Sequence, residues 1–390
     1  MRPWRLVSLL SVTATASYLC RVNVSVAGVL MMRELGLSQQ AMGRVFSAFL
    51  VGYALFQVPG GMLADRFGAP RVLAWASLAW VAATAWMAGA GASVAALLGA
   101  RCLLGVAEAP MFPTAAQAIS GALPVARRGR ATGMVVAAVG LGSAIAPPLV
   151  SFLMLRWGWR AALMISSLPA FAVGCIWMWV RRSVVAAGSR SNDVDRAVPP
   201  VGPTQTRTFV LLTLSYSLQG YVGYIFIFWF YLYLVDVRHF DLLRGALFSS
   251  LPWLLSIVSI PLGGWLFDKL PCDRRTLPIA GLSGSGVFTA IGAHAQNPYL
   301  AAVCMAVATA LVLCVEAPFW ATMTAVTGTR KGAGGGVMNM GSNIGGLISP
   351  ALTPVLAASI GWEGALLVSA ALAVVAALLW FWIRPQAVTA

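Results

Sequence analysis

Twelve apolar stretches, each long enough to cross a lipid bilayer, follow one another along this 390-residue chain. A transmembrane helix needs about 20 consecutive apolar residues. We place the stretches at 6–31, 41–63, 72–93, 95–120, 131–154, 160–180, 208–234, 242–267, 276–295, 298–326, 333–357 and 362–383. Only 9% of the residues are charged, whereas soluble domains carry roughly 25%. We therefore expect an all-α integral membrane protein with the lipid bilayer as its solvent, and no soluble enzyme.

One polar segment, residues 181–207, separates the first six stretches from the last six. It is rich in Ser, Asp, Pro and Gly, which is the composition of a linker. We expect an N-terminal six-helix bundle at 1–180, a cytoplasmic linker at 181–207 and a C-terminal six-helix bundle at 208–390.

Basic residues indicate the orientation of the chain. With a cytoplasmic N-terminus, eighteen Lys and Arg residues fall in inner segments and six in outer segments. Positive residues gather on the cytoplasmic side of a membrane protein, so both termini should be cytoplasmic, in a plasma (bacterial inner) membrane. The net charge of +15 is spread singly or in pairs over helix ends. This distribution excludes the basic stripe of a nucleic-acid-binding protein. The N-terminal MRPWR leads directly into an apolar stretch, which we interpret as a retained first helix.

The two halves of the chain repeat each other at an offset of 203 residues. GGMLADR at 60–66 aligns with GGWLFDK at 263–269, and Gly158-Trp159 aligns with Gly361-Trp362. Six-span halves repeated in parallel are an architecture of secondary transporters, whose substrate site lies at the midplane between the halves. The repeat predicts alternating access by rocking of the two bundles.

The turn GGMLADRFGAPR at 60–71 resembles the signature loop of the major facilitator superfamily, and GGWLFDKL at 263–270 resembles its second copy. The resemblance covers the whole chain and implies the major facilitator fold. In that family these loops act as latches between helices. The implied cytoplasmic gate residues are Gly61, Asp65, Arg66, Gly68, Arg71, Asp268 and Lys269. A tight polar turn with ordinary orientation charges is the alternative for the first loop taken alone.

Four charged residues lie inside the predicted spans: Arg21, Arg101, Glu108 and Glu316. Each costs about 2.5–3.5 kcal/mol at a helix centre on insertion scales, so such residues face a cavity or a partner. The Arg21 guanidinium can bind a carboxylate through two parallel hydrogen bonds, and Tyr18 lies on the same helix face. A structural pairing of Arg21 with another helix is the alternative.

The fourth span places Arg101 and Glu108 on one helix face, about 10 Å apart along the axis. A carboxyl group in this setting can exchange a proton near neutral pH, and a bound anion can tune that exchange. This spacing suits proton coupling, and a structural Arg101–Glu108 network is the alternative. Pro110 and Pro113 should kink or loosen the helix just beyond Glu108.

Four segments narrow the resemblance to the anion:cation symporters, a branch that includes bacterial sugar-acid transporters, sialin and vesicular glutamate transporters. They are YLCRVNVSVA at 18–27, FSAFLVGYALFQVPGG at 46–61, RCLLGVAEAPMFP at 101–113 and GVMNMGSNIGGLISP at 336–350. The resemblance implies that Arg21 binds the substrate carboxylate and that Glu108 takes the coupling proton. The further site residues that it implies are Tyr53, Gln57, Asn339 and Asn343. Cys20 stands where the bacterial sugar-acid members usually carry an aspartate, which leaves the proton stoichiometry open.

The seventh span carries Ser217, Tyr221, Tyr224, Phe228 and Tyr231 at alternating spacings of three and four residues. The two central tyrosines align with Tyr18 and Arg21 at offset 203, so Tyr221 and Tyr224 are candidate substrate contacts; packing is the alternative. Glu316, followed one turn later by Trp320, mirrors Glu108. Glu316 is either a second titrating group or a paired structural acid, and Trp320 is a further candidate substrate contact.

These patterns together predict a secondary active transporter of a small organic anion bearing a carboxylate, such as a sugar acid, by proton symport. The alternatives are a uniporter or exchanger of the same anions and a membrane sensor on the same fold. The chain has no Walker A sequence, so ATP-driven pumping is not expected. We expect no cofactor other than H⁺ as coupling ion, no metal site, no nucleic-acid partner and a monomer.

Overall fold

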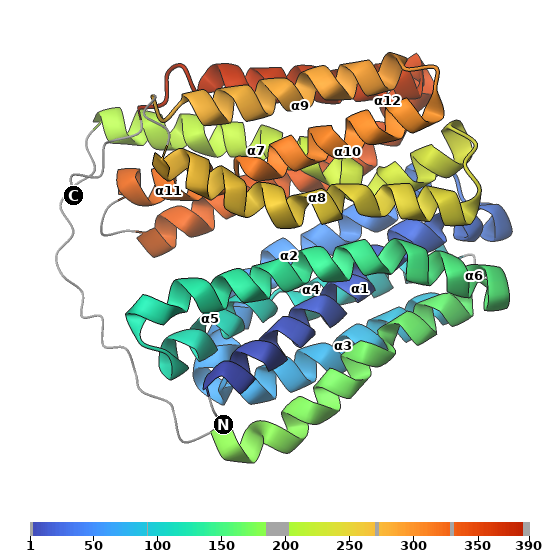
Figure 1. Ribbon diagram of the computed structural model, residues 1–390. Helices are drawn as coiled ribbons and strands as arrows, with labels where there is room; N and C mark the ends of the chain where they lie inside the picture. Colours follow the sequence, from blue (N-terminus) through green and yellow to red (C-terminus); the bar gives the residue numbers. More distant parts are fainter. Residues whose placement is uncertain (1–2, 92, 185–202, 270–272, 328–330, 385–390) are drawn as a thin grey trace. The chain divides into compact units, whose positions relative to one another are not determined.

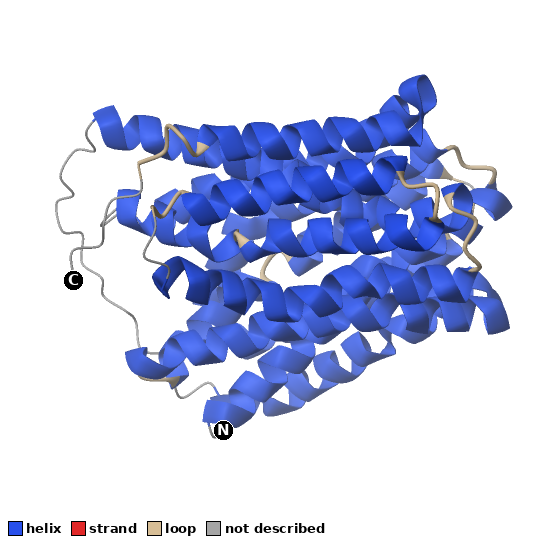
Figure 2. Cartoon of the chain, turned by 45° about the horizontal axis from the view of Figure 1, so that its top comes forward, coloured by secondary structure: helices blue, strands red, loops and turns tan. Residues whose placement is uncertain are grey.

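The computed structural model describes residues 3–91, 93–184, 203–269, 273–327 and 331–384, and every regular element in these ranges is a helix (Figure 2). The helices of the first half are α1 (Pro3–Leu35), α2 (Gln39–Phe67), α3 (Ala69–Gly89), α4 (Val94–Glu108), α5 (Met111–Ala122) and α6 (Val125–Val184). Those of the second half are α7 (Pro203–Leu232), the π-helix η2 (Tyr233–Val237), α8 (Leu242–Lys269), α9 (Thr276–His294), α10 (Pro298–Cys314), α11 (Glu316–Thr327) and α12 (Lys331–Leu379) (Figure 1).

Within the described ranges, ten helical segments are long and apolar enough to cross a membrane. Two of them, Arg127–Val180 and Gly334–Leu379, contain 54 and 46 residues, more than one crossing needs. Each is bent at a glycine with positive φ, Gly158 at 76° and Gly361 at 77°, a backbone conformation that glycine adopts without steric cost. Dividing both segments at the glycine reproduces the predicted spans on either side, and the predicted all-α membrane fold is confirmed.

The helix breaks at Glu108 and Glu316 follow from the local sequence. α4 ends at Glu108 and α5 begins at Met111, with Pro110 between them. A proline lacks the N–H that continues a helix, which accounts for the predicted loosening beyond Glu108. The second half repeats this break, because α10 ends at Cys314 and α11 begins at Glu316.

The chain separates into two compact units by its internal contacts. The first unit holds residues 1–191 and 231–250, and the second holds 192–230 and 251–390. Three contacts join 231–250 to the first half: the Ser151 and Tyr231 hydroxyls lie 2.8 Å apart, Ser250 donates to the Ala144 carbonyl at 2.7 Å, and Arg33 pairs with Asp236 at 2.6 Å. The predicted bundle boundaries at 180 and 208 stay a prediction, since most of the linker at 181–207 lies outside the described residues.

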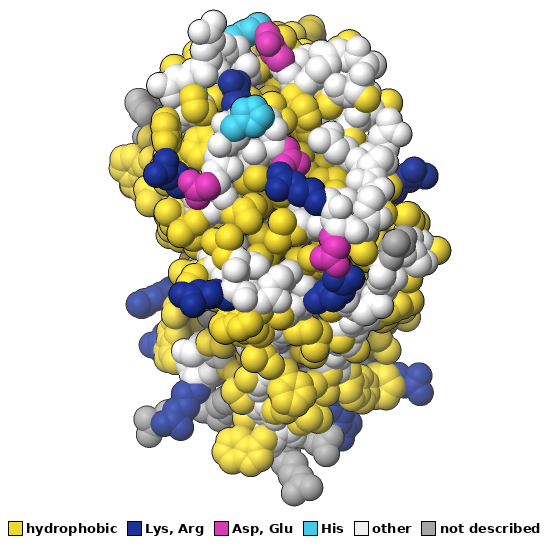
Figure 3. Space-filling model, turned by 90° about the vertical axis from the view of Figure 1, so that its right-hand side faces the viewer, with side chains coloured by type: hydrophobic (Ala, Val, Ile, Leu, Met, Phe, Trp, Pro, Cys, Tyr) yellow, Lys and Arg dark blue, Asp and Glu magenta, His cyan; other side chains and the backbone are white. Residues whose placement is uncertain are grey.

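Many large apolar side chains of the described residues are exposed, as expected for a chain solvated by lipid. Large apolar side chains such as Trp179, Val58 and Leu55 are more than 70% exposed. Figure 3 shows hydrophobic side chains over much of one face, with acidic and basic side chains scattered between them. Soluble proteins rarely expose apolar patches of this extent.

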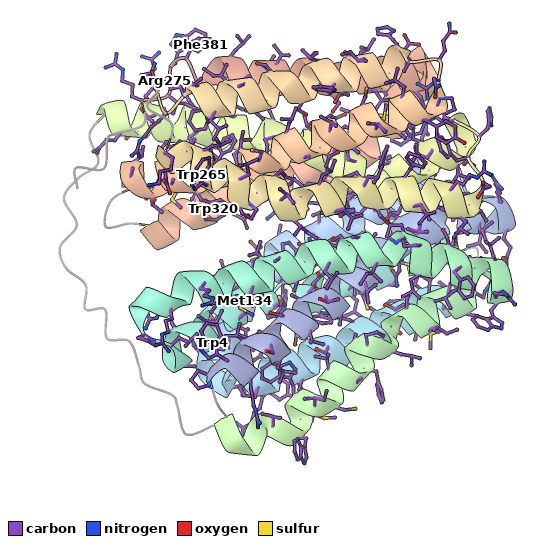
Figure 4. All side chains as sticks on the ribbon, in the orientation of Figure 1. Trp4, Met134, Trp265, Arg275, Trp320 and Phe381 are labelled. Atoms are coloured by element: carbon purple, nitrogen blue, oxygen red, sulfur yellow. The ribbon has the colours of Figure 1, made fainter. Side chains whose placement is uncertain are left out.

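The second unit has its own buried core. Phe319 packs against Tyr216 and Trp380, with ring centroids 4.9 Å and 5.1 Å away. At one end of this unit Arg275 donates to the Phe381 carbonyl at 3.0 Å, which ties the start of α9 to the end of α12 (Figure 4). These contacts join α7, α9, α11 and α12 in the unit that carries Glu316, which is partly buried.

Glycines allow α2 and α4 to approach closely in the first unit. A Cβ atom added at Gly105 would lie 2.0 Å from the Phe49 carbonyl oxygen, and one added at Gly52 would lie 2.2 Å from the Cys102 carbonyl oxygen. Both clashes involve backbone atoms, so the helices would have to separate.

We expect Gly105→Ala to lower the free energy of unfolding by about 1–3 kcal/mol, because overpacking of a tight helix contact is destabilising. The melting temperature of the purified protein in detergent measures the effect. Gly133→Ala on α6 is the matched control, because nothing lies within 4 Å of its added Cβ atom. Equal melting temperatures for the two variants would contradict this account of the α2–α4 contact.

Candidate functional site

Three charged side chains are buried in the described part of the chain, and all three belong to the first unit. Arg21 is 3% exposed, Glu108 2% and Arg101 0%. The Arg21 Nε lies 3.2 Å from the Glu108 Oε1, and the Ser17 hydroxyl donates to the same carboxylate. The first and fourth predicted spans therefore meet at an ion pair inside the membrane segment, and Ser17 is a member of the site that the sequence analysis did not identify.

Aromatic rings surround the Arg21 guanidinium. Its central carbon lies 4.5 Å from the Tyr18 ring centroid, 4.6 Å from that of Phe49 and 4.8 Å from that of Tyr53. The Arg21 Nη1 also donates to the Tyr18 hydroxyl at 3.0 Å. Cation–π attraction of this kind grows when the groups are desolvated, so the rings hold the guanidinium plane in place. Phe49 was not predicted, because an apolar ring in an apolar span carries no signal of its own.

Arg101 acts on the backbone of α1 rather than on a carboxylate. Its Nη1 and Nη2 both point to the Arg21 carbonyl oxygen at 3.4 Å, and its guanidinium carbon lies 5.2 Å from the Phe49 ring centroid. Arg101 therefore fixes the stretch of α1 that presents Arg21. A direct role of Arg101 in proton coupling stays a prediction.

The other substrate contacts predicted for the first half, Tyr53 and Gln57, lie on α2. Tyr53 is buried, and Gln57 lies one turn further along the same helix and is half-buried. Gly60 lets α2 approach the α4–α5 break, because a Cβ atom there would lie 2.8 Å from the Pro110 side chain. The glycine and the proline thus position α2 against the segment that carries Glu108.

The second unit holds one partly buried acid in a polar cluster. The Tyr216 hydroxyl donates to Glu316 Oε1, the Trp320 Nε1 donates to the same oxygen at 3.0 Å, and the Gln219 Nε2 donates to Oε2 at 3.2 Å. Trp320 lies on α11 (Figure 4). Tyr216 and Gln219 were missed by the sequence analysis, although an amide inside an apolar span was a usable signal for Gln219.

Some of the regularly spaced aromatic residues of α7 take part in packing. Tyr224 stacks on Phe228 with centroids 5.9 Å apart, and a Cβ atom at Gly346 would lie 2.5 Å from the Tyr224 ring. Tyr221 is 4% exposed, whereas Tyr231 belongs to the first unit. Asn343 is buried and Asn339 is half-buried on α12. Substrate contact by Tyr221, Tyr224, Asn339 and Asn343 therefore stays a prediction.

The predicted gate loop contacts α5 through one of its acidic residues. Asp65 accepts a hydrogen bond from the Gln117 Nε2 at 2.6 Å. Among the described residues, no ion pair joins Asp65 to Arg66 or Arg71. The turn itself depends on Gly68, whose φ of 81° separates α2 from α3. The loop therefore links the end of α2 to α5, and a latch role stays a prediction.

The remaining gate residues lie at the surface of each unit. Gly61 on α2 faces Pro113 of α5, since a Cβ atom added there would lie 3.6 Å from the proline Cβ. At the end of α8, Asp268 and Lys269 are exposed. Their part in gating stays a prediction.

Comparison with known proteins decides the family. The sequence profile of the Major Facilitator Superfamily matches residues 10–338 and 274–389. The chain belongs to the Major Facilitator Superfamily. This facilitator is 33% identical over 393 residues to the "Probable sulfoacetate transporter SauU" of Cupriavidus necator, an alignment that covers 95% of this chain and 91% of that protein. It is 26% identical to the "Hexuronate transporter" of Bacillus subtilis, with 93% of this chain and 90% of that one covered.

The fold of this facilitator also matches solved structures. A bacterial homologue of the human lysosomal transporter Spinster, in an inward-facing and occupied conformation, superposes with a TM-score of 0.84 at 18% identity, covering 98% of this chain and 97% of that one. The chain is thus a multi-pass membrane transporter and not an enzyme, and its relatives of known name carry organic anions.

Proposed function

We propose that this facilitator is a proton-coupled symporter of a small organic anion. The observation that carries the proposal is the buried ion pair of Arg21 and Glu108, 3.2 Å apart. The names of the relatives support the substrate class, because sulfoacetate and hexuronates are small anions with a carboxylate. We also propose a cytoplasmic location for both termini in a bacterial inner membrane, on the arginine asymmetry described above.

The ion pair couples the proton to the anion by competition for one guanidinium. The Glu108 carboxylate forms an ion pair with the Arg21 guanidinium when no substrate is bound. An incoming carboxylate takes over Arg21, and the displaced Glu108 carboxylate then binds a proton at one of its oxygens because a buried, unpaired charge is costly. Each ligand therefore favours binding of the other, which is a reciprocal coupling free energy. Release of the anion on the other side returns Arg21 to Glu108 and expels the proton.

Reconstitution of the full chain in proteoliposomes tests the proposal. Saturable accumulation of an organic anion, driven by a proton gradient directed into the vesicles (acidic outside), supports symport. Counterflow without accumulation would replace symport by exchange or uniport, and ligand binding without flux would indicate a sensor. A panel of sugar acids, dicarboxylates and sulfoacetate identifies the anion through thermal stabilisation, because a ligand at 100 times its Kd adds about 2.7 kcal/mol.

Cys20 sets an expectation for the charge moved in each cycle. We expect the Cys20 thiol to carry no proton in the cycle, so Glu108 alone would bind one H⁺ per anion. We expect uptake of a monovalent carboxylate to be electroneutral and unaffected by membrane potential, which acts on net charge at about 2.3 kcal/mol per 100 mV. The readout is uptake in proteoliposomes with a potassium–valinomycin potential at zero pH gradient. Clear stimulation of the uptake of a monovalent carboxylate by an inside-negative potential would refute one-proton coupling. Glu316 would then be the first candidate for a second proton-binding site.

A further inference from the structure

The buried charges of the first unit do not balance. Arg21, Arg101 and Glu108 are the three charged side chains buried in the described residues, so the interior holds two cations and one anion. The other described acids of this unit lie at helix ends or in loops: Glu34 pairs with Arg160, Asp236 with Arg33 and Asp241 with Arg244, and Asp65 binds Gln117. The interior therefore has a net charge of +1 with Glu108 ionised and +2 with Glu108 protonated.

Arg101 is the source of the excess. It is 0% exposed, its Nη atoms lie 3.4 Å from a carbonyl oxygen, and among the described residues its buried Nε has no hydrogen-bond partner. Cys20 is fully buried and directly precedes Arg21, whose carbonyl oxygen accepts the hydrogen bonds of Arg101. It contributes a neutral thiol where an acid would cancel the charge. A buried guanidinium with no carboxylate is an expensive arrangement, and a bound anion can offset it.

We propose that the transported substrate is a small dianion, with one acidic group for Arg21 and a second acidic group that balances Arg101. This proposal rests on the proposed function and specifies its substrate class. In the loaded state Glu108 carries a proton, so the two guanidinium charges face the two charges of the substrate. The second group need not touch Arg101, which is shielded from solvent. The positive charge of Arg101 stabilises the second acidic group of the substrate electrostatically, through the protein interior.

The size of the effect follows from Coulomb's law. One unit charge about 10 Å from the second acidic group, at an effective dielectric constant of about 20, changes affinity by roughly tenfold. We therefore expect a dianion to bind about ten times more tightly than a ligand of the same shape that lacks one charge.

Two matched ligand pairs test the proposal on the purified full-length protein. Sulfoacetate is compared with sulfamoylacetate, and malonate with malonamate; each second member replaces one charged group by a neutral amide of similar shape. We expect at least a tenfold lower Kd for the dianion in each pair, measured calorimetrically at pH 7. Equal affinities within a pair would overturn the dianion proposal and leave the transporter proposal standing. Absence of binding by these ligands and by monovalent sugar acids would overturn both.

Variants locate the origin of the preference. Cys20→Asp adds the missing negative charge beside Arg101 and should reduce the dianion preference to less than threefold, and Cys20→Ser is the neutral control that should keep the wild-type ratio. Arg101→Gln removes the excess charge directly and should also reduce the ratio, which covers the case in which Cys20→Asp does not fold. An undiminished dianion preference in folded Cys20→Asp or Arg101→Gln protein would overturn the assignment to the charge imbalance.

Discussion

Arg21→Ala is expected to weaken binding of organic anions by at least about 100-fold. Arg21 is the buried cation that the aromatic rings of Tyr18, Phe49 and Tyr53 hold in place, and removal of one partner from a buried, hydrogen-bonded charge pair costs about 2–5 kcal/mol. Isothermal titration of the purified protein with the anion found by thermal stabilisation measures the loss.

Two controls distinguish loss of the contact between Arg21 and the anion from loss of the folded structure. Arg33→Ala removes an arginine from the same helix, α1, where the side chain is 59% exposed, and it should bind the anion within twofold of wild type. Arg21→Lys keeps the charge but not the planar fork and should rescue binding poorly. A monodisperse Arg21→Ala protein that binds the anion with wild-type affinity would show that the anchor lies elsewhere.

Glu108→Gln is expected to abolish accumulation driven by a pH gradient while substrate binding and exchange persist. Glutamine resembles the protonated acid in shape and still offers a carbonyl oxygen to the Ser17 hydroxyl that contacts Glu108. The variant cannot release a proton, so the coupled step is lost. Counterflow and pH-driven uptake, measured side by side in proteoliposomes, separate the two activities.

Glu316→Gln is the matched variant in the second half. Glu316 accepts hydrogen bonds from Tyr216, Trp320 and Gln219. Three hydrogen-bond donors from α7 and α11 around one carboxylate favour the structural interpretation of this acid, because the acid then holds the two helices together. We therefore expect Glu316→Gln to lower stability and to retain pH-driven accumulation. If Glu108→Gln still concentrates substrate with unchanged pH dependence and Glu316→Gln does not, the proton site is Glu316.

Much of the fold was predictable because its signals are local. The length of each apolar stretch sets the number of crossings, and the 203-residue offset between Gly158 and Gly361 marks the same bend in both halves, where the structure has φ values of 76° and 77°. A backbone that bends between two spans needs little more than a glycine at the right distance. The helix break after Glu108 was likewise visible in the prolines that follow it.

The candidate site was only partly predictable. Charged residues in apolar spans stand out in any sequence, so Arg21, Arg101, Glu108 and Glu316 were identified without coordinates. Their partners were not: Ser17, Phe49 and Tyr216 are ordinary residues for their helices, and the amide of Gln219 was a usable signal that the sequence analysis missed. The contact between Asp65 and Gln117 was not predicted either, because the two residues are 52 positions apart in the sequence.

The sequence by itself determined that the chain spans a lipid bilayer and that its two halves repeat. It also determined that the charged side chains of Arg21, Arg101 and Glu108 need partners within the membrane. Only the tertiary structure decided which partners they found: Glu108 for Arg21 at 3.2 Å and a backbone carbonyl for Arg101 at 3.4 Å. The reason is physical. The length and apolar character of a helix depend on residues near in sequence, whereas the distance between side chains on α1 and α4 depends on how the helices pack, which residues far apart in the sequence decide together.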